Sequence, residues 1–598
     1  MSNVSDSKLL DDLNKVARAN KISTEELPRS TYQAEGEYSS TTLEGRFGSW
    51  TDAKTAASER RSAYVSKETR KDVKGEILSI YLALVKAQGS DVSTEDLAAS
   101  GVTKDQVRHH FGSMSALDQL ARTASPKTFK DVDLGSLFSQ KALHRLRDAV
   151  SGFKRFVITT AVVGCEVDKP FFHSLKNYCK HQDAALLVLV VSDPASRTTV
   201  GGYGNIDKIL LNEYIVMEDT AINSNLFIST IKLSAKHIDP ITGLGRIGQQ
   251  NGSFVYASPK QRMKPVPVSN SKMPHVIMTT GAITKASYGT DRYLSERTAY
   301  IAEHDHVMGA IIVEVQDEEI FHYRQVQASK KDGSITDLGV RYSPNQTKKV
   351  QPEAFVLGDW HSGETDPVAS KCWLDIIDTL KPRRVVLHDA FNGHSINHHE
   401  AEQSITKAHR AEKAELSLTS ELLGLGHDLS AFADKVDEVV MVKSNHDEFL
   451  PRYLQSGFYV KDPQNHKVAL KLADAMLDGK DPLRYGVEVV AGFDLPNVRW
   501  LGRDEDYKVA KIQLGSHGDK GPNGSRGSLA NMEAAYGSSV TGHSHTPEIL
   551  RNAWAVGTSS LLKLTYNVGP SSWMHTSCLI YPDGSRQLIN VIFGRWRA

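Results

Sequence analysis

Short apolar, β-branched runs alternate with helical patterns over most of the chain beyond about residue 150. Strand-like runs lie at 156–163, 185–191, 276–280, 307–315 and 321–327. The amphipathic stretch 170–181 falls between the first two runs, which is the βαβ pattern of a parallel sheet. The segment 150–345 is therefore predicted to be an α/β domain of its own, and we assign no catalytic motif to it.

Five further runs of the same kind end in side chains that bind metals. The runs are 354–357, 384–387, 439–442, 509–514 and 538–541. The motifs that follow them are Asp359-Trp360-His361, His388-Asp389, Asn445-His446-Asp447, His517 and Gly542-His543-Ser544-His545. Strand ends are where α/β sheets assemble their sites. Carboxylate and amide oxygens mixed with imidazole nitrogens suit Mn²⁺, Mg²⁺, Fe²⁺ or Zn²⁺. The segment 346–598 is thus predicted to hold a divalent metal site.

The first 130 residues follow a helical pattern that occurs twice. Leu9–Ala19 and Ile77–Ala87 are helical stretches, and Ser23-Thr24-Glu25-Glu26-Leu27 recurs as Ser93-Thr94-Glu95-Asp96-Leu97. Each copy continues to a short helix that ends in Phe-Gly-Ser, and Ser or Thr before a helix with Gly after it are ordinary caps. Two small helical modules are predicted, at 1–64 and 65–130.

Bulk composition limits the classes of protein that fit. With 598 residues the chain is too long for one domain, so the fold class expected is multi-domain α/β. The 71 basic and 71 acidic residues balance, so DNA binding would need local basic patches or metal ions. The four cysteines form no metal-binding pair and are expected to be buried thiols. No signal peptide or membrane span is seen, which predicts a cytoplasmic protein with no membrane partner.

The N-terminal repeat resembles the homing-endonuclease-associated repeat, a small helical DNA-binding module. The matching residues of the first copy are Tyr32, Gly36, Ser39, Arg46, Phe47, Gly48, Ser49, Trp50 and Ala53. The second copy departs from the pattern at His110 and Met114. The resemblance implies contact with DNA, with Arg46 as a candidate phosphate-binding residue. The alternative is a pair of interaction modules that pack on the rest of the protein.

The C-terminal motifs, over about residues 350–560, resemble the calcineurin-like metallophosphoesterases and among them the SbcD-type DNA nucleases. The resemblance implies a four-layer αββα domain with two metal ions, for which Mn²⁺ is expected. Asp359, His361 and His545 would hold the first ion, and Asn445, His517 and His543 the second. Asp389 would bridge the two ions. His388 and Ser444 stand where the family usually has Gly.

His446 matches a family histidine that faces the substrate, and it is the expected donor of a proton to the leaving oxygen. Its neighbour Asp447 is expected to raise the pKa of His446 or to orient its ring. The Gly-rich loop 518–527 carries Lys520 and Arg526, which are candidate contacts to phosphate or DNA; a simple flexible loop fits the same sequence equally well.

The leading hypothesis from the sequence is a two-metal deoxyribonuclease that hydrolyses DNA phosphodiester bonds. The layout resembles the early deoxyribonucleases with which T-five-type phages degrade host DNA, which implies action in the host cytoplasm. The alternatives are a phosphoesterase for small molecules or phosphoproteins, and a DNA-binding regulator with an idle phosphoesterase core. The sequence leaves the oligomeric state open, and a homo-oligomer is compatible with it.

Overall fold

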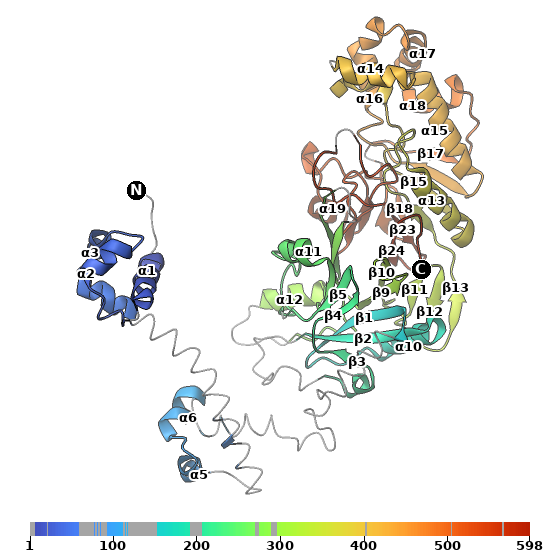
Figure 1. Cartoon of the computed structure of the whole chain (residues 1–598). Helices are drawn as coiled ribbons and strands as arrows, with labels where there is room; N and C mark the ends of the chain where they lie inside the picture. The colour runs from blue at the N-terminus through green and yellow to red at the C-terminus, as the bar shows by residue number, and fades with distance from the viewer. Residues whose placement is uncertain are drawn as a thin grey trace. The chain divides into compact units, whose positions relative to one another are not determined.

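The computed structural model describes two compact units, 1–133 and 134–598, which Figure 1 colours from blue to red along the chain. The described residues are 6–20, 22–58, 93–111, 152–191, 206–231, 233–269, 274–288, 296–400, 403–503, 505–564 and 567–598, with isolated positions at 77, 80, 81, 84, 114 and 117.

The first unit consists of short helices around two separate apolar cores. The first repeat contains α1 (Asp6–Ala19), α2 (Arg29–Glu35) and α3 (Ser40–Phe47), whose core includes Leu9, Leu13 and Leu43. The second repeat contains α5 (Thr94–Ala99) and α6 (Lys104–Phe111), and its core is Ile77, Tyr81, Leu97, Val102, Val107 and Leu117. The helix predicted at 77–87 lies mostly outside the described residues.

The repeat motif of the first copy builds the fold of that module. Tyr32 donates a hydrogen bond of 2.5 Å to buried Asp12 and packs against Trp50 with ring centroids 5.3 Å apart. A Cβ at Gly36 would lie 2.6 Å from the Tyr32 ring, so that position has no room for a side chain. Gly48 ends α3 with φ 96°, a conformation that favours glycine. These contacts explain the motif by packing, and DNA binding by the module stays a prediction.

The second unit is built on three large sheets and one small one. The five-stranded sheet has the order β10 (Phe321–Gln327), β9 (Gly309–Val315), β1 (Arg155–Val162), β2 (Ala184–Val191), β3 (Tyr214–Val216). The six-stranded sheet has the order β17 (Val498–Trp500), β16 (Glu438–Met441), β15 (Arg384–Leu387), β14 (Ala354–Val356), β23 (Thr576–Ile580), β24 (Arg586–Asn590). The ten-stranded sheet has the order β18 (Lys508–Val509), β19 (Ile512–Gln513), β20 (Ser539–Thr541), β22 (Ala553–Ala555), β21 (Glu548–Leu550), β7 (Arg262–Val266), β8 (His275–Thr279), β6 (Ser253–Tyr256), β5 (Leu226–Ser229), β4 (Thr220–Asn223). The small sheet is β11 (Ile335–Asp337), β12 (Val340–Tyr342), β13 (Thr347–Lys349).

The predicted mixed α/β class is confirmed, and the C-terminal layers run helix, sheet, sheet, helix. Alternate residues of β14 face opposite ways: Phe355 packs on the helix side, and Val356 packs toward the ten-stranded sheet. The helices of the first side include α13 (Pro367–Leu380) and α15 (Leu418–Ala433). Helix α19 (Leu529–Tyr536) packs against β20 and β22.

The remaining helices cover the sheets or gather at one end of the unit. Helices α10 (Lys169–Gln182) and α11 (Gly245–Asn251) cover the five- and ten-stranded sheets, and α12 (Glu296–His304) precedes β9. Figure 1 shows a helical group at the top, made of α14 (Ser404–Glu412), α16 (Phe449–Ser456), α17 (His466–Leu477) and α18 (Pro482–Tyr485).

Two predictions about organisation are wrong. Residues 150–345 do not form a separate domain, because β7 pairs with β21 and so joins strands of that segment to strands of 346–598 in one sheet. The run 509–514 is not one strand, because Ala510 and Lys511 have φ of 49° and 69° and turn the chain into a hairpin between β18 and β19. A strand pairing across nearly 290 residues leaves no pattern in the local sequence, and neither does a turn without Gly.

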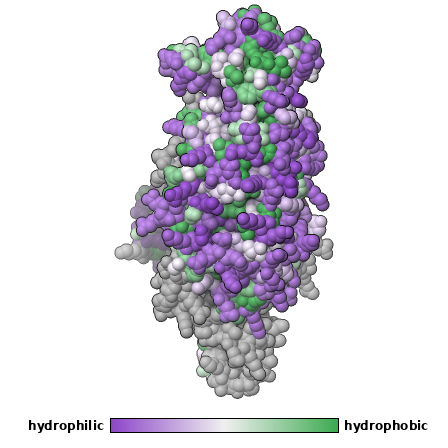
Figure 2. Space-filling view, turned by 90° about the vertical axis from the view of Figure 1, so that its right-hand side faces the viewer, coloured by the Kyte–Doolittle hydropathy of each residue, from purple (hydrophilic) through white to green (hydrophobic). Residues whose placement is uncertain are grey.

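A hydrophilic surface agrees with the 71 basic and 71 acidic residues of the chain. Figure 2 shows a largely hydrophilic face on which hydrophobic residues occur in small groups. Among the described residues, no helix combines the length and apolar character needed to cross a bilayer. The four cysteines are buried and unpaired, as predicted.

A buried ion network connects the five-stranded sheet to the rest of the unit. Arg324 on β10 donates to Asp337 at 2.7 Å and to Glu314 at 2.9 Å, and Gln587 of β24 donates to Asp337 at 2.7 Å. Burial would raise the pKa of Glu314, but Arg324 outweighs burial and lowers the pKa to about 2. The carboxylate therefore stabilises the fold above its ordinary pKa and loses that effect as the pH falls toward 2.

Replacing Arg324 by Met is expected to lower the free energy of unfolding by about 3–5 kcal/mol at pH 7, because two buried carboxylates lose their partner. The deficit should shrink in acid, where protonation removes those charges. Urea unfolding at pH 7 and pH 4 measures both. The matched control is Arg155→Met, which removes a half-exposed cation 3.5 Å from Glu314 and should cost less than about 1 kcal/mol. Equal losses in the two variants would contradict this account.

Candidate metal centre

The predicted ligand residues all follow strands whose ends lie at one edge of the C-terminal sheets. Asp359 and His361 follow β14, Asp389 follows β15, and Asn445 follows β16; these three strands are parallel. The other three histidines come from the other sheet, with His517 after β19 and both His543 and His545 after β20. Parallel strands bring carboxyl ends together within each sheet, and the packing of the two sheets brings together residues nearly 190 positions apart, such as Asp359 and His545.

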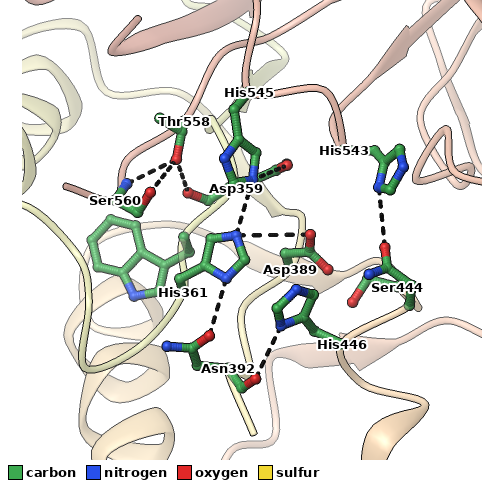
Figure 3. A network of polar contacts seen from close by, with 12 residues as sticks. Asp359, His361, Asp389, Asn392, Ser444, His446, His543, His545, Thr558 and Ser560 are labelled. Atoms are coloured by element: carbon green, nitrogen blue, oxygen red, sulfur yellow. Dashed lines mark hydrogen bonds and ion pairs between the residues drawn. The ribbon is translucent and has the colours of Figure 1, made fainter. Parts of the chain in front are cut away.

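The first group of donor atoms comprises Asp359, His361, Asp389 and His545, all buried (Figure 3). His545 Nε2 lies 3.1 Å from Asp359 Oδ2 and 3.1 Å from His361 Nε2. His361 Nε2 is also 3.8 Å from Asp389 Oδ2. Four potential ligand atoms from three strand ends therefore surround one point.

The second group shares Asp389 with the first and adds His517, His543 and the amide of Asn445. His517 Nε2 lies 3.1 Å from Asp389 Oδ2 and 3.1 Å from Asn445 Oδ1. His543 Nδ1 lies 3.1 Å from the same amide oxygen. The structure thus brings together all seven side chains predicted as ligands, divided as the sequence resemblance implies, with Asp389 in both groups.

The donor set fits divalent cations. Ligand atoms about 2.1 Å from a cation lie about 3 Å apart when their bonds are at right angles. Two imidazole nitrogens facing each other at 3.1 Å leave at most one proton between them, and a shared cation satisfies both lone pairs. Oδ1 of Asp359 and Oδ1 of Asp389 are buried without a hydrogen-bond donor among the described residues. Such buried orphan atoms call for an ion or water.

Backbone strain concentrates at the candidate ligands. His361, Asp389, His543 and His545 have φ of 49°, 44°, 72° and 54°, in the left-handed region that side chains other than glycine rarely adopt. Each such residue costs on the order of 1–3 kcal/mol, and this strain is typical of functional sites. Four of the seven ligand positions carry it.

Burial and mutual charge set the protonation of the histidines. Burial lowers the pKa of His361 to about 3, so its ring is neutral at pH 7. Burial alone would lower the pKa of His517 too, but the carboxylates of Asp389 and Asp359 outweigh it and raise the pKa to about 9. The pocket is therefore negative enough to hold a proton on His517, and a cation binding there must displace that proton.

The orientation of the catalytic candidate His446 depends on Asn392, a residue that the sequence did not assign. His446 Nδ1 donates to the Asn392 carbonyl at 2.9 Å, while His361 Nδ1 lies 3.3 Å from Asn392 Oδ1. One residue therefore fixes the ring of a metal-ligand candidate and the ring of the proton-donor candidate. Its only signal in the sequence is its place three positions after Asp389.

The prediction that Asp447 orients His446 is wrong. Asp447 Oδ2 accepts a hydrogen bond of 2.8 Å from the Ser444 backbone, and Ser444 Oγ accepts one of 3.2 Å from the Asp447 backbone. Asp447 is thus committed to the turn after β16, where burial raises its pKa to about 6. Ser444 closes that turn, and Asn445 beside it keeps its place in the second group of donor atoms.

Gly542 keeps the two sheets close enough for the ligands to meet. A Cβ there would lie 2.1 Å from Asp359 Oδ1 and 2.9 Å from His388 Cβ. Gly542→Ala is expected to weaken Mn²⁺ binding by about 10–100-fold, which is the usual loss when the residues that position a metal ligand are displaced. Calorimetric titration measures this. Gly502→Ala is the matched control, because the nearest atom to its Cβ would be 3.9 Å away. Unchanged affinity in Gly542→Ala would contradict the geometry.

The predicted nucleic-acid contacts belong to neither donor group. Lys520 and Arg526 are exposed and face each other across a bridge in the loop after His517. Arg46 belongs to the first unit, on α3, where its Nε lies 3.1 Å from Asp6 Oδ1. The positions of these three residues do not show whether they bind DNA, so the three contacts stay predictions.

Comparison with known proteins gives one informative match. The chain is similar to Protein A1 of Escherichia phage T5, with 26% identity over 468 residues that cover 74% of this chain and 83% of that protein. The similarity is longer than the segment 346–598, so it includes more than the metal-ligand motifs, and it is consistent with a protein of a T5-like phage. No protein-family model matches the chain, and no solved structure matches it.

Proposed function

We propose that the protein is a metal-dependent deoxyribonuclease that hydrolyses phosphodiester bonds of DNA. The observation that carries the proposal is the convergence of seven potential ligands on two adjacent points, with Asp389 common to both. Donor sets of carboxylates, imidazoles and an amide that place two ions side by side are typical of phosphodiester hydrolysis.

The candidate ligands and His446 have different roles in the proposed reaction. Asp359, His361 and His545 would hold one ion and Asn445, His517 and His543 the other, with Asp389 between them. Bound divalent cations, for which we favour Mn²⁺, would supply positive charge to the phosphoryl oxygens and lower the pKa of a water. His446 keeps its Nδ1 proton on the Asn392 carbonyl, so Nε2 is the atom that gives a proton to the leaving oxygen.

DNA is the proposed substrate for two reasons. The N-terminal modules carry a motif of DNA-binding type, and the exposed loop with Lys520 and Arg526 follows a metal-ligand residue directly. Separately, similarity to a protein of Escherichia phage T5 supports a phage protein that acts inside a host cell. We therefore place its action in the host cytoplasm, with host DNA as the target.

A substrate panel tests the proposal. The purified chain with Mn²⁺ is expected to cleave duplex or single-stranded DNA, to hydrolyse bis-para-nitrophenyl phosphate and to prefer that diester to para-nitrophenyl phosphate. Chelation with EDTA should abolish each activity, and added Mn²⁺ should restore it. Preference for the monoester without DNA cleavage would instead indicate a phosphoesterase of small molecules or phosphoproteins. Absence of all hydrolysis would indicate a DNA-binding regulator with an idle core.

A further inference from the structure

The two halves of the second unit repeat one arrangement of strands. In the earlier half β1, β2 and β3 run parallel, and the antiparallel strands β9 and β10 extend the sheet on the other side of β1. In the later half β14, β15 and β16 run parallel, and β23 and β24 extend the sheet beyond β14 in the same way. Helix α10 connects β1 to β2 as α13 connects β14 to β15.

The ten-stranded sheet is a palindrome of the same two halves. Read from its two edges, β4-β5-β6-β8-β7 and β18-β19-β20-β22-β21 have the same succession of antiparallel, parallel, parallel and antiparallel pairings. Helix α11 precedes β6 as α19 precedes β20. At the centre β7 pairs with β21, its own counterpart.

Four backbone hydrogen bonds of the earlier half each have a counterpart in the later half. Ala282 N donates to Val307 O at 2.8 Å, and Thr558 N donates to Met574 O at 2.9 Å. Three further pairs are Ile283 N to Thr160 O (2.8 Å) with Ser559 N to Asp359 O (2.8 Å), Asp168 N to Ile283 O (2.9 Å) with Asp366 N to Ser559 O (2.8 Å), and Lys285 N to Glu166 O (2.8 Å) with Leu561 N to Glu364 O (2.9 Å).

Local sequence signals correspond as well. Gly164 and Gly363, both at positive φ, precede Asp168 and Asp366, which cap α10 and α13. Each helix has 14 residues, carries Pro in its first turn and ends at a left-handed residue with φ near 50°. These shared turns and caps indicate a duplicated unit rather than two unrelated α/β folds.

The correspondence shows what replaces the metal ligands in the earlier half. The hydrogen bonds put Thr160 at the position of Asp359, and β2 ends in the apolar residues Leu189, Val190 and Val191 where β15 leads into Asp389. The stretch Ala257-Ser258-Pro259-Lys260 follows β6 where Gly542-His543-Ser544-His545 follows β20. Among the described residues, these positions offer no carboxylate or imidazole for an ion.

We infer that residues 152–349 are a degenerate second copy of the phosphoesterase-type lobe 350–598, which serves as a built-in, metal-free partner for it. Two elements meet their own counterparts: β7 pairs with β21, and β10 lies beside β24, where Asn590 donates to the Tyr323 carbonyl at 3.4 Å. Such self-matching contacts are the mark of a two-fold interface. The pairing also covers strand edges that a single lobe would leave open to association.

The test combines sedimentation equilibrium with a count of bound Mn²⁺ on the full chain. Residues 152–349 already pair with the strands β21 and β24 of 350–598, so a monomer is expected at micromolar concentration. A stable dimer would overturn the inference. The metal count rests on the proposed function: about two ions per chain are expected.

Variants at equivalent positions assign the ions to a lobe. Asp359→Asn should lower the count or the affinity at least tenfold, whereas Thr160→Val should leave both unchanged. About four ions per chain, or a loss of binding in Thr160→Val, would overturn the inference. If the wild-type chain bound no Mn²⁺, the proposed function would fail, and sedimentation alone would then test whether residues 152–349 act as a built-in partner.

Discussion

Replacement of Asp389 by Asn is expected to reduce DNA cleavage on the order of 10³-fold or more, which corresponds to the loss of several kcal/mol of charge stabilisation. Asp389 is the only side chain in both donor groups, and it is 1% exposed. Asn keeps the shape of the side chain but removes the negative charge that both ions would share. Cleavage rates at increasing Mn²⁺ concentration measure the effect and show whether excess metal restores activity.

A second carboxylate near the site provides the control for Asp389→Asn. Asp428 accepts hydrogen bonds from Trp360 at 2.8 Å and Ser362 at 2.6 Å, and it belongs to neither donor group. Asp428→Asn is therefore expected to change cleavage only a few-fold. Retention of cleavage and of Mn²⁺ affinity within tenfold in Asp389→Asn would contradict the assignment of the bridging ligand.

His446→Gln is expected to slow DNA cleavage by about 10²–10⁴-fold, the usual effect of removing a general acid. Hydrolysis of bis-para-nitrophenyl phosphate should fall much less, because a nitrophenolate leaves without needing a proton. His446 is expected to donate the proton because Asn392 holds its Nδ1 and its ring lies 4.7 Å from that of His361, a candidate metal ligand. Rates on the two substrates at saturating Mn²⁺ measure the difference.

The matched control for His446→Gln is His427→Gln, which changes an exposed histidine whose ring contacts Phe493. That variant should behave as wild type on both substrates. An equal loss on DNA and on the nitrophenyl diester in His446→Gln would mean that His446 binds substrate or metal and does not donate the proton.

The sequence indicated the candidate ligands because each follows a β-branched run that ends near a strand end. Asp359 and Asp389 come together through the parallel pairing of β14 and β15, which such runs indicate directly. His543 comes from the other sheet, and the runs do not indicate how the two sheets pack. Asn392 and the turn of Asp447 with Ser444 could not be predicted, because they depend on how the segments after β15 and β16 fold back on each other. The positive φ of four ligand residues also leaves no trace in residue type.

The strands of the earlier half were predicted more accurately than its role. The runs at 156–163 and 185–191 correspond to β1 and β2, and the helix at 170–181 corresponds to α10. The relation of this half to 350–598 lies in backbone hydrogen bonds and strand order. Thr160, which stands at the position of Asp359, carries no sign of that relation in its residue type.

Anomalous X-ray diffraction at the manganese edge, from crystals of the full chain grown with Mn²⁺, would show directly whether the seven candidate ligands hold two ions. Two peaks about 3.5–4 Å apart are expected. One should be bound by Asp359, His361 and His545, the other by Asn445, His517 and His543, with Asp389 contacting both. A map with no peak among these seven residues would contradict this expectation.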